Sequence, residues 1–353
     1  MNDEYKIDDN RPISYFSTNS FCGYKINDLI NSLKKQILKE NNVDKAIFFT
    51  LELLSSGKID KLYSLFLNIY CKNINTFNPT FPHLFFTRYL YYTKLKEYYK
   101  EILKAERNID LLFRNDQGIR NHMCELTIIL LKSSKKKEVL KIPTFKRVPD
   151  DINTLNFSDT YGLPGDDKEV LIIFNQFTHY TKNNEIKKAL EWFTVALHVE
   201  KLKIKEKQSF KIAKRNISGV DEKWQTDFTF IFWQLILDLS KSRDIIVQRS
   251  VKSFFNIYKY NFTSKSRKID LFTCSLSFVS EVFSVNVPLV QFMSSLIQPI
   301  MNVNIFFTEI KKHEVCIAKV EELKKKKKKL NPILVQKLTM QNEMDQIFLN
   351  KIQ

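Results

Sequence analysis

The chain has 353 residues, of which 44% are hydrophobic and 27% are charged. Lys and Arg outnumber Asp and Glu by 56 to 39, which gives a net charge of +17. This composition is typical of a globular protein that buries a sizeable core. Only six glycines are present, which excludes folds that need many tight turns, such as a β-sandwich, and glycine-rich nucleotide-binding folds.

The start of the chain is acidic and carries no apolar core of a signal peptide. We therefore expect an intracellular protein. Its five cysteines are odd in number and far apart in the sequence, so we expect reduced thiols and no disulfide framework. They are Cys22, Cys71, Cys124, Cys274 and Cys316.

Apolar residues recur at helical spacing along most of the chain. Residues 44–57 form a first predicted helix that ends at Gly57, and residues 59–74 form the next after a very short turn. The pair predicts an antiparallel helical hairpin. Further helices are predicted at residues 84–106, 118–132, 168–181, 185–201, 224–240, 245–260, 268–283, 304–328 and 332–352. We predict an all-α fold of antiparallel helical hairpins packed as a bundle or short solenoid.

Composition changes suggest where the chain divides. Residues 135–167 hold three of the nine prolines and two of the six glycines, which predicts a linker or long loop. It would separate an N-terminal helical domain at residues 1–134 from a basic C-terminal helical domain at 168–331, followed by a terminal amphipathic helix at 332–353. Residues 203–221 are basic and lack an apolar stripe, so we expect a mobile loop there.

Residues 282–307 include no charged side chain and are long enough to span a membrane. They also contain several Asn, Gln and Ser residues together with Pro288 and Pro299, which are unfavourable in hydrocarbon. We therefore expect a buried helix pair interrupted near the two prolines, and no membrane span.

Positive charge is concentrated in the later part of the chain. Residues 1–117 carry 17 basic and 14 acidic side chains, whereas residues 118–353 carry 39 and 25. Of the 56 basic residues, 46 are Lys and 10 are Arg. Lysine suits phosphate as a point charge but does not read base edges as arginine does. Binding of nucleic acid would therefore be tolerant of sequence and steeply dependent on salt.

Basic side chains alternate with aromatic ones in two later segments, a pattern that favours binding to a phosphate backbone with stacking of bases. The predicted nucleic-acid-binding residues are Lys201, Lys203, Lys205, Lys207, Lys211, Lys214, Arg215, Lys252, Lys259, Lys265, Arg267 and Lys268. The same charge also fits a solvated surface or an acidic protein partner. The basic stretch at 135–147 and the run from Lys324 to Lys329 are less specific.

Signatures of catalysis and of metal binding are missing from the sequence. His122 with Cys124 and His313 with Cys316 are the only close His and Cys pairs, and zinc needs four converging ligands. No phosphate-binding glycine loop or nucleophile motif occurs. We predict no cofactor, no metal and no enzymatic activity.

The segment from Asp44 to Pro79, DKAIFFTLELLSSGKIDKLYSLFLNIYCKNINTFNP, resembles the C-terminal collar of clamp-loader-related recombination ATPases, the Werner-helicase-interacting protein family. Ala46, Leu53, Gly57 and the Asn78-Pro79 step fit that scheme. Asn73-Ile74-Asn75 stands where the family has an acidic-Ile-Gly segment, and the ATPase core of the family is missing.

Most of the chain is similar to an uncharacterised helical protein of mimivirus-like nucleocytoplasmic large DNA viruses. The likeness rests on LELLSSG, NTFNPTFP, LLFRNDQGIRNHMCELTIILLKSSKKKE and FIFWQLILDL. It implies replication, transcription or virion assembly, in the host cytoplasm or a virus factory. We predict a non-enzymatic accessory protein that binds nucleic acid or a nucleic-acid-bound partner in viral genome replication or expression. The alternative is a structural or scaffolding protein of the virion or its assembly.

Overall fold

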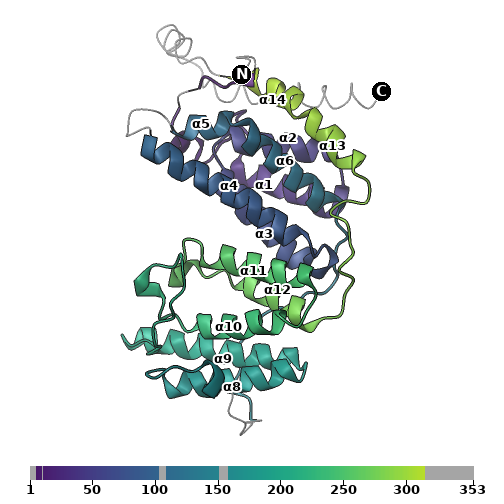
Figure 1. The fold of residues 1–353 in the computed structure, drawn as a ribbon. Helices are drawn as coiled ribbons and strands as arrows, with labels where there is room; N and C mark the ends of the chain where they lie inside the picture. The colour runs from purple at the N-terminus through teal and green to yellow at the C-terminus, as the bar shows by residue number, and fades with distance from the viewer. Residues whose placement is uncertain (1–4, 10, 103–108, 151–157, 315–353) are drawn as a thin grey trace. The chain divides into compact units, whose positions relative to one another are not determined.

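The fold of the chain is all-α, as predicted (Figure 1). The structure is a computed structural model that describes residues 5–9, 11–102, 109–150 and 158–314. Within these ranges the only β-type pairing is one isolated bridge between Asn19 and Lys25. The predicted helix at 332–352 and the second half of the one at 304–328 lie outside the described residues.

Two compact units divide the chain, and neither is continuous in sequence. Unit 1 comprises residues 1–69, 88–133 and 290–353, and unit 2 comprises residues 70–87 and 134–289. Two long helices, α3 (Ile59–Asn73) and α4 (Phe81–Ile102), each contribute residues to both units. Unit 2 thus includes residues 70–87 from the first part of the chain, and unit 1 includes the residues after 289.

Unit 1 is built around α6 (Gln117–Lys132), whose residues from Met123 to Leu131 are almost all buried. A helix that is apolar on nearly all sides needs neighbours on all sides. The main neighbour of α6 is α2 (Val43–Ser55). Inside their interface, the hydroxyl groups of Thr50 on α2 and Thr127 on α6 form a hydrogen bond of 2.9 Å. The other elements of the unit are η2 (Ile13–Phe16), α1 (Ile26–Lys35), η3 (Gln36–Glu40), α5 (Ile109–Asn115), α13 (Ser294–Met301) and α14 (Val303–Lys311).

The turn predicted at Gly57 is confirmed, although the hairpin that it was expected to close is not formed. Gly57 has a φ of +68°, and Lys58 N–H donates to the Leu53 carbonyl at 2.9 Å, which ends α2 in a left-handed cap. However, α2 packs mainly on α6, α1 and α14 and does not lie along α3. Helical periodicity identifies an apolar face but does not identify the partner of that face.

Buried arginines fasten the N-terminal segment to the helices of unit 1. The side chain of Arg114 is fully buried and donates to the carbonyls of Ser55 at 2.6 Å and Asp9 at 3.0 Å. The guanidinium of Arg11 donates a hydrogen bond to the Asp9 carboxylate, with 2.9 Å between Nε and Oδ1. Burial lowers the pKa of Arg114 to about 10, and the Asp9 carboxylate opposes this effect. The segment is thus held by charge-assisted bonds in the core.

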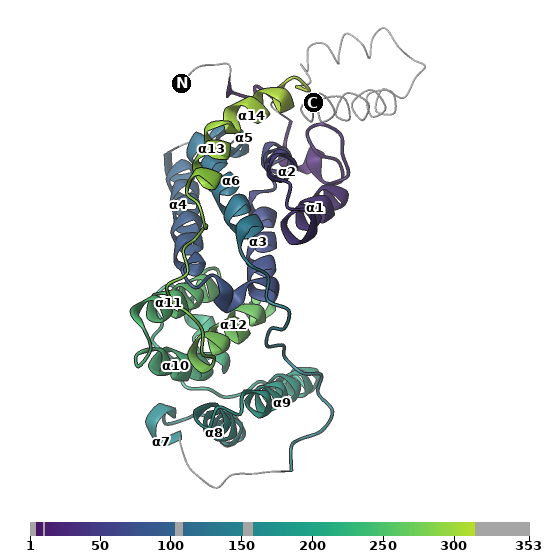
Figure 2. The same cartoon turned by 90° about the vertical axis from the view of Figure 1, so that its right-hand side faces the viewer.

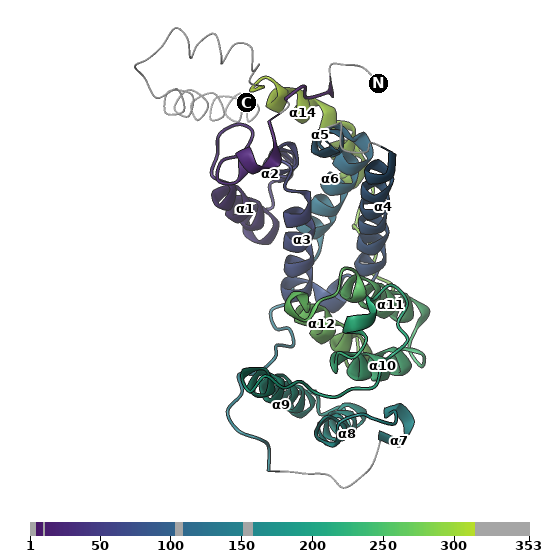
Figure 3. The same cartoon turned by 90° about the vertical axis from the view of Figure 1, so that its left-hand side faces the viewer.

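Unit 2 has an aromatic core. Phe193 and Phe272 are stacked with ring centroids 4.2 Å apart, and Phe232 meets Phe177 edge to face at 5.0 Å. Such geometry adds to the stabilisation from burial. The elements of unit 2 other than the shared helices are η4 (Asn75–Phe77), α7 (Ser158–Tyr161), α8 (Lys168–Lys182), α9 (Ile186–Lys205), η5 (Glu222–Trp224), α10 (Thr229–Ser240), α11 (Ile245–Lys259), η6 (Ser264–Ser266) and α12 (Ile269–Ser280) (Figure 3).

The described part of the expected linker is packed onto unit 2. Phe145 is stacked on His198 of α9 with ring centroids 3.7 Å apart, and the Thr194 hydroxyl of the same helix donates to the Pro143 carbonyl at 3.3 Å. Lys136 N–H donates to the Asn73 carbonyl at 2.7 Å. Residues 134–150 are therefore irregular in structure, contact α9 through Pro143 and Phe145, and are part of this unit.

The charge-free stretch at 282–307 is not the buried helix pair that we expected. It is non-helical up to residue 292, and Val282 is 98% exposed. Pro299 lies inside α13, whose only buried residue is Leu296. Among the described residues, no helix combines the length and the apolar character that crossing a bilayer requires.

The turn at Gly57 generates a stability prediction, because a Cβ at this position would lie 2.6 Å from the Ile13 side chain. We expect Gly57→Ala to lower the free energy of unfolding by about 2–4 kcal/mol, through left-handed strain and overpacking. Thermal unfolding followed by far-UV circular dichroism measures this change in the free energy of unfolding. In an Ile13→Ala background the same change should cost only about 1–2 kcal/mol, because the strain remains and the clash is relieved. Equal costs in the two backgrounds would contradict this account.

A second prediction concerns Glu52 on α2, which is fully buried and accepts a bond from Cys22 N–H at 2.7 Å. Burial raises the pKa of Glu52 above its ordinary value. The folded state therefore holds this proton more tightly, and stability falls as the pH rises through the folded pKa. Glu52→Gln should raise the melting temperature by a few degrees at pH 8 and have a smaller effect at pH 4. A pH-independent effect would rule out this carboxyl as the cause.

Candidate nucleic-acid interface in unit 2

The open end of the α8–α9 hairpin positions several of the predicted residues. The two helices pack side by side (Figure 2). They are joined by residues 183–185, so the start of α8 and the end of α9 lie at the same end. Asp167 caps α8 by accepting from Glu169 N–H at 3.2 Å. The chain then returns past this end, where Asp167 N–H donates to the Lys211 carbonyl at 2.7 Å.

A pocket of about 790 Å3 opens at this end, between the turn at residues 165–167 and the segment 203–211. Three of the predicted nucleic-acid-binding residues, Lys203, Lys207 and Lys211, line it together with Gln208 and Ser209. Gln208 and Ser209 were not among the predicted residues, because single polar residues in a basic loop form no recognisable sequence pattern. The structure thus brings part of the predicted set to one concave site.

Lys207 occupies a backbone conformation that favours glycine. Its φ is +60°, and the next residue, Gln208, donates from its N–H to the Lys203 carbonyl at 2.7 Å. This is the left-handed position that ends a helix, where a residue with a side chain carries strain. A lysine is thus present at a position where glycine would be less strained.

The carboxylates beside the pocket differ in how far they are neutralised. The side chain of Asp166 is buried and forms an ion pair with Arg215. Its carboxylate also accepts hydrogen bonds from Ala213 N–H and Leu163 N–H, both at 2.8 Å. Lys203 forms ion pairs with both Asp167 and Glu169, with 3.7 Å between Nζ and Asp167 Oδ2 and 2.9 Å between Nζ and Glu169 Oε2. The hydrogen bond to Glu169 is the largest cause that raises the pKa of Lys203.

Lys207 and Lys211 provide the accessible charge of the pocket. Both are exposed, and neither makes an ion pair with another described residue. Two unneutralised ammonium groups and the Ser209 hydroxyl are suited to a phosphate group.

Arg215, by contrast, is a structural residue. Its side chain is 2% exposed, is bonded to Asp166, and donates to the Tyr161 carbonyl at 2.8 Å. Burial lowers its pKa, and the Asp166 carboxylate opposes that effect. Its guanidinium fastens the loop that follows α9 and is not presented to a ligand. With Phe210, Ile212 and Val220 also buried, residues 206–221 are anchored, unlike the mobile loop that the sequence predicts.

Arg267 is also bound within the fold. It donates to Glu200 on α9, at 2.6 Å between Nη2 and Oε1, and to Asp227 before α10, at 3.0 Å between Nε and Oδ2. Burial alone would lower its pKa, but the bonds to Glu200 and Asp227 prevail and raise it. Lys268, next in sequence, donates to the Ile257 carbonyl at 3.1 Å, and burial lowers its pKa. Both cations connect helices of unit 2.

A second accessible group of cations lies on α11. Lys252 is exposed, and Lys259 donates to the Ser218 carbonyl at 2.9 Å. Burial and the nearby Lys252 ammonium lower the pKa of Lys259. Arg249 is exposed one turn before Lys252, and no acidic residue occurs within α11. Arg249 was not among the predicted residues, because it lies outside the runs of basic residues and joins Lys252 only through helical spacing.

The remaining predicted residues are less organised. Lys201 and Lys205 are exposed near the end of α9, and Lys265 is exposed before α12. Lys214 is paired with Glu222 on the surface. The segment 206–221 connects the two groups of cations, because it starts at the pocket and reaches Lys259 at Ser218.

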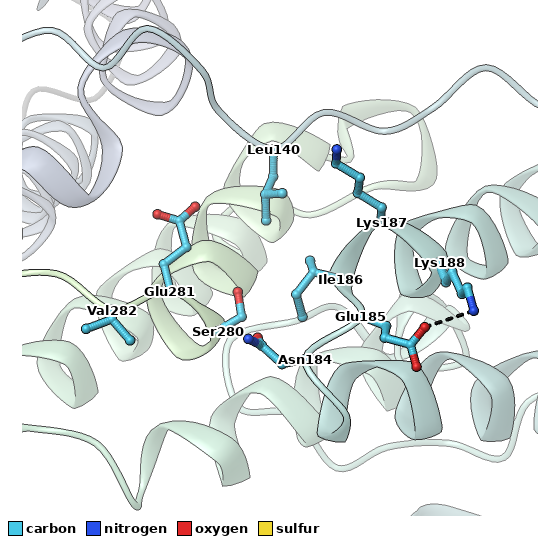
Figure 4. A pocket seen from close by; sticks show the side chains of 9 residues that line it. All are labelled: Leu140, Asn184, Glu185, Ile186, Lys187, Lys188, Ser280, Glu281 and Val282. Carbon is cyan, nitrogen blue, oxygen red and sulfur yellow. Dashed lines mark ion pairs between the residues drawn. The ribbon is translucent and has the colours of Figure 1, made fainter.

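A second pocket of unit 2, of about 710 Å3, lies at the closed end of the α8–α9 hairpin (Figure 4). Glu185 and Lys188 form an ion pair across 2.8 Å at its rim, and Glu281 is paired with Lys136. Because its charges are largely matched, this pocket offers a polyanion no excess of positive charge.

No cluster of three or more potential metal-ligating His, Cys, Asp or Glu side chains occurs in the part of the chain that the structure describes. No protein-family model matches the chain, and no curated protein or solved structure was found to be similar to it.

The Arg267 cluster generates a prediction about unit 2. Arg267→Met leaves Glu200 and Asp227 without their partner in a largely buried site, which should cost about 3–5 kcal/mol of unfolding free energy. All three tryptophans, Trp192, Trp224 and Trp233, lie in unit 2, so urea unfolding followed by tryptophan fluorescence reports on it.

The matched control is Lys214→Met, which removes an exposed ion pair and should change the free energy by less than about 1 kcal/mol. If the two variants were equally stable, the Arg267 cluster would not be a major contributor to the stability of unit 2.

Proposed function

We propose that unit 2 binds nucleic acid through the pocket at the open end of the α8–α9 hairpin and the cations of α11. The observation that carries the proposal is the convergence of Lys203, Lys207 and Lys211 on one pocket. The chain would act as a non-enzymatic accessory protein. The resemblance to a protein of large DNA viruses leads us to place this role in viral genome replication or expression.

Binding should be sequence-tolerant. The accessible cations are mainly lysines, while Arg215 and Arg267 are engaged in ion pairs inside the unit. Lysine contacts to phosphate supply affinity by releasing counterions but carry no information about sequence. Oligonucleotides of equal length and different sequence should bind with similar affinity at a given salt concentration.

The test is fluorescence anisotropy with labelled single-stranded DNA, double-stranded DNA and RNA over a salt series. We expect binding of the wild type to weaken steeply with salt. The double variant Lys207→Glu and Lys211→Glu should bind at least about tenfold more weakly, with a salt slope shallower by about two, because two phosphate contacts are lost.

The matched control is the double variant Lys34→Glu and Lys39→Glu, which reverses two positive charges of unit 1. Both lysines are exposed and form no ion pair among the described residues. It alters the net charge equally and should change affinity by less than about twofold, apart from the general field effect. Equal losses in both double variants would show that net charge matters and the pocket does not. No salt-sensitive binding by the wild type would refute the proposal altogether.

The variant Lys207→Gly separates binding from folding. It removes one ammonium group and relieves the left-handed strain at this position, so it should not lower stability. We expect weaker binding with an unchanged or higher melting temperature. Undiminished binding would exclude Lys207 from the interface.

A further inference from the structure

The outer side of α13 exposes a row of large apolar side chains. Met293, Ile297 and Met301 follow at intervals of four residues, which places them on one side of the helix, and they are 60%, 50% and 76% exposed. Phe292, just before α13, is 64% exposed, and Ile305, in the following helix α14 (Val303–Lys311), is 54% exposed. We call these five residues the α13 stripe.

The stripe belongs to a helix that is fixed in place on its other side. α13 contacts α6, and its inward residue Leu296 is only 6% exposed. The following helix, α14, packs on α2 with Phe307 and Ile310 fully buried. The stripe is therefore exposed because of the way this helix pair packs, and not because the helix is detached from unit 1.

An exposed surface of this kind is unusual for a protein that acts alone. Five large apolar side chains are each at least half exposed here, and large exposed apolar patches mark interaction sites. Covering the patch would be favourable in proportion to the area removed from water.

The charge pattern identifies the partner. Residues 282–307 contain no Asp, Glu, Lys or Arg, although 27% of the chain is charged and its net charge is +17. Two copies of so basic a chain repel each other at most surfaces. At the α13 stripe they can approach without placing like charges opposite each other, and an uncharged apolar helix is complementary to itself across a two-fold axis.

We propose that two copies of the chain associate through the α13 stripe, related by a two-fold axis. Two stripes facing each other would bury on the order of 1,000 Å2, near the lower limit for a specific interface. The dimer should therefore be reversible and weak, with a dissociation constant in the micromolar range. Added salt should strengthen it by screening the repulsion between the two basic chains, opposite to its effect on nucleic-acid binding.

Sedimentation velocity of the full chain tests the proposal. The wild type should shift from monomer to dimer over the micromolar range, at lower concentration in 500 mM than in 100 mM salt. Ile297→Asp and Met301→Asp should each raise the dissociation constant at least about tenfold, because a carboxylate would be buried without a partner.

The matched control is Ile172→Asp on α8, which alters an apolar residue of similar exposure, 52%, in unit 2. It should leave dimerisation unchanged, and circular dichroism establishes that all variants are folded. A wild type that stays monomeric over the whole concentration range would overturn the proposal. The α13 stripe would then be a binding surface for a different protein. A dimer that survives both stripe substitutions would equally overturn it.

Discussion

The ion pairs of Arg267 with Glu200 and Asp227 hold together the part of unit 2 that carries the proposed interface. They fasten the end of α9 to the residues before α10 and α12, at a site where each partner is mostly buried. The loop between α9 and α10 is thus fixed near both of its ends. The ion pair between Arg215 and Asp166 fixes it at a further position. The pocket lysines can therefore project from a rigid base without helping to hold it together.

Sequence periodicity predicted most of the longer helices, because these bury a continuous apolar face, but it did not predict α1, α5, α7 or α13. The bounds of α8, α11 and α12 differ from the predicted ones by only a few residues. It could not assign the helices to units, because α3 and α4 pack on different cores at their two ends. It also missed the anchoring of residues 206–221, which depends on widely spaced apolar residues and on one buried arginine.

The predicted interface shows the same limit. Lysines and arginines were grouped by their proximity in sequence, but the structure separates them by their partners. Arg267 meets a carboxylate 67 positions away and Arg215 one 49 positions away, which no local pattern reveals. Lys207 and Lys211 retain accessible charge because the two carboxylates that line the pocket, Asp166 and Asp167, are paired with Arg215 and Lys203. Which cations are free is a property of the tertiary fold.

Most arginines of the described chain donate to carboxylates or carbonyls inside it, namely Arg11, Arg88, Arg114, Arg120, Arg215, Arg243 and Arg267. The cations of the pocket are lysines. Acetylation abolishes the charge of a lysine but has no counterpart at a guanidinium. The charge of this surface can thus be altered by covalent modification of its lysines while the internal framework of the protein stays intact.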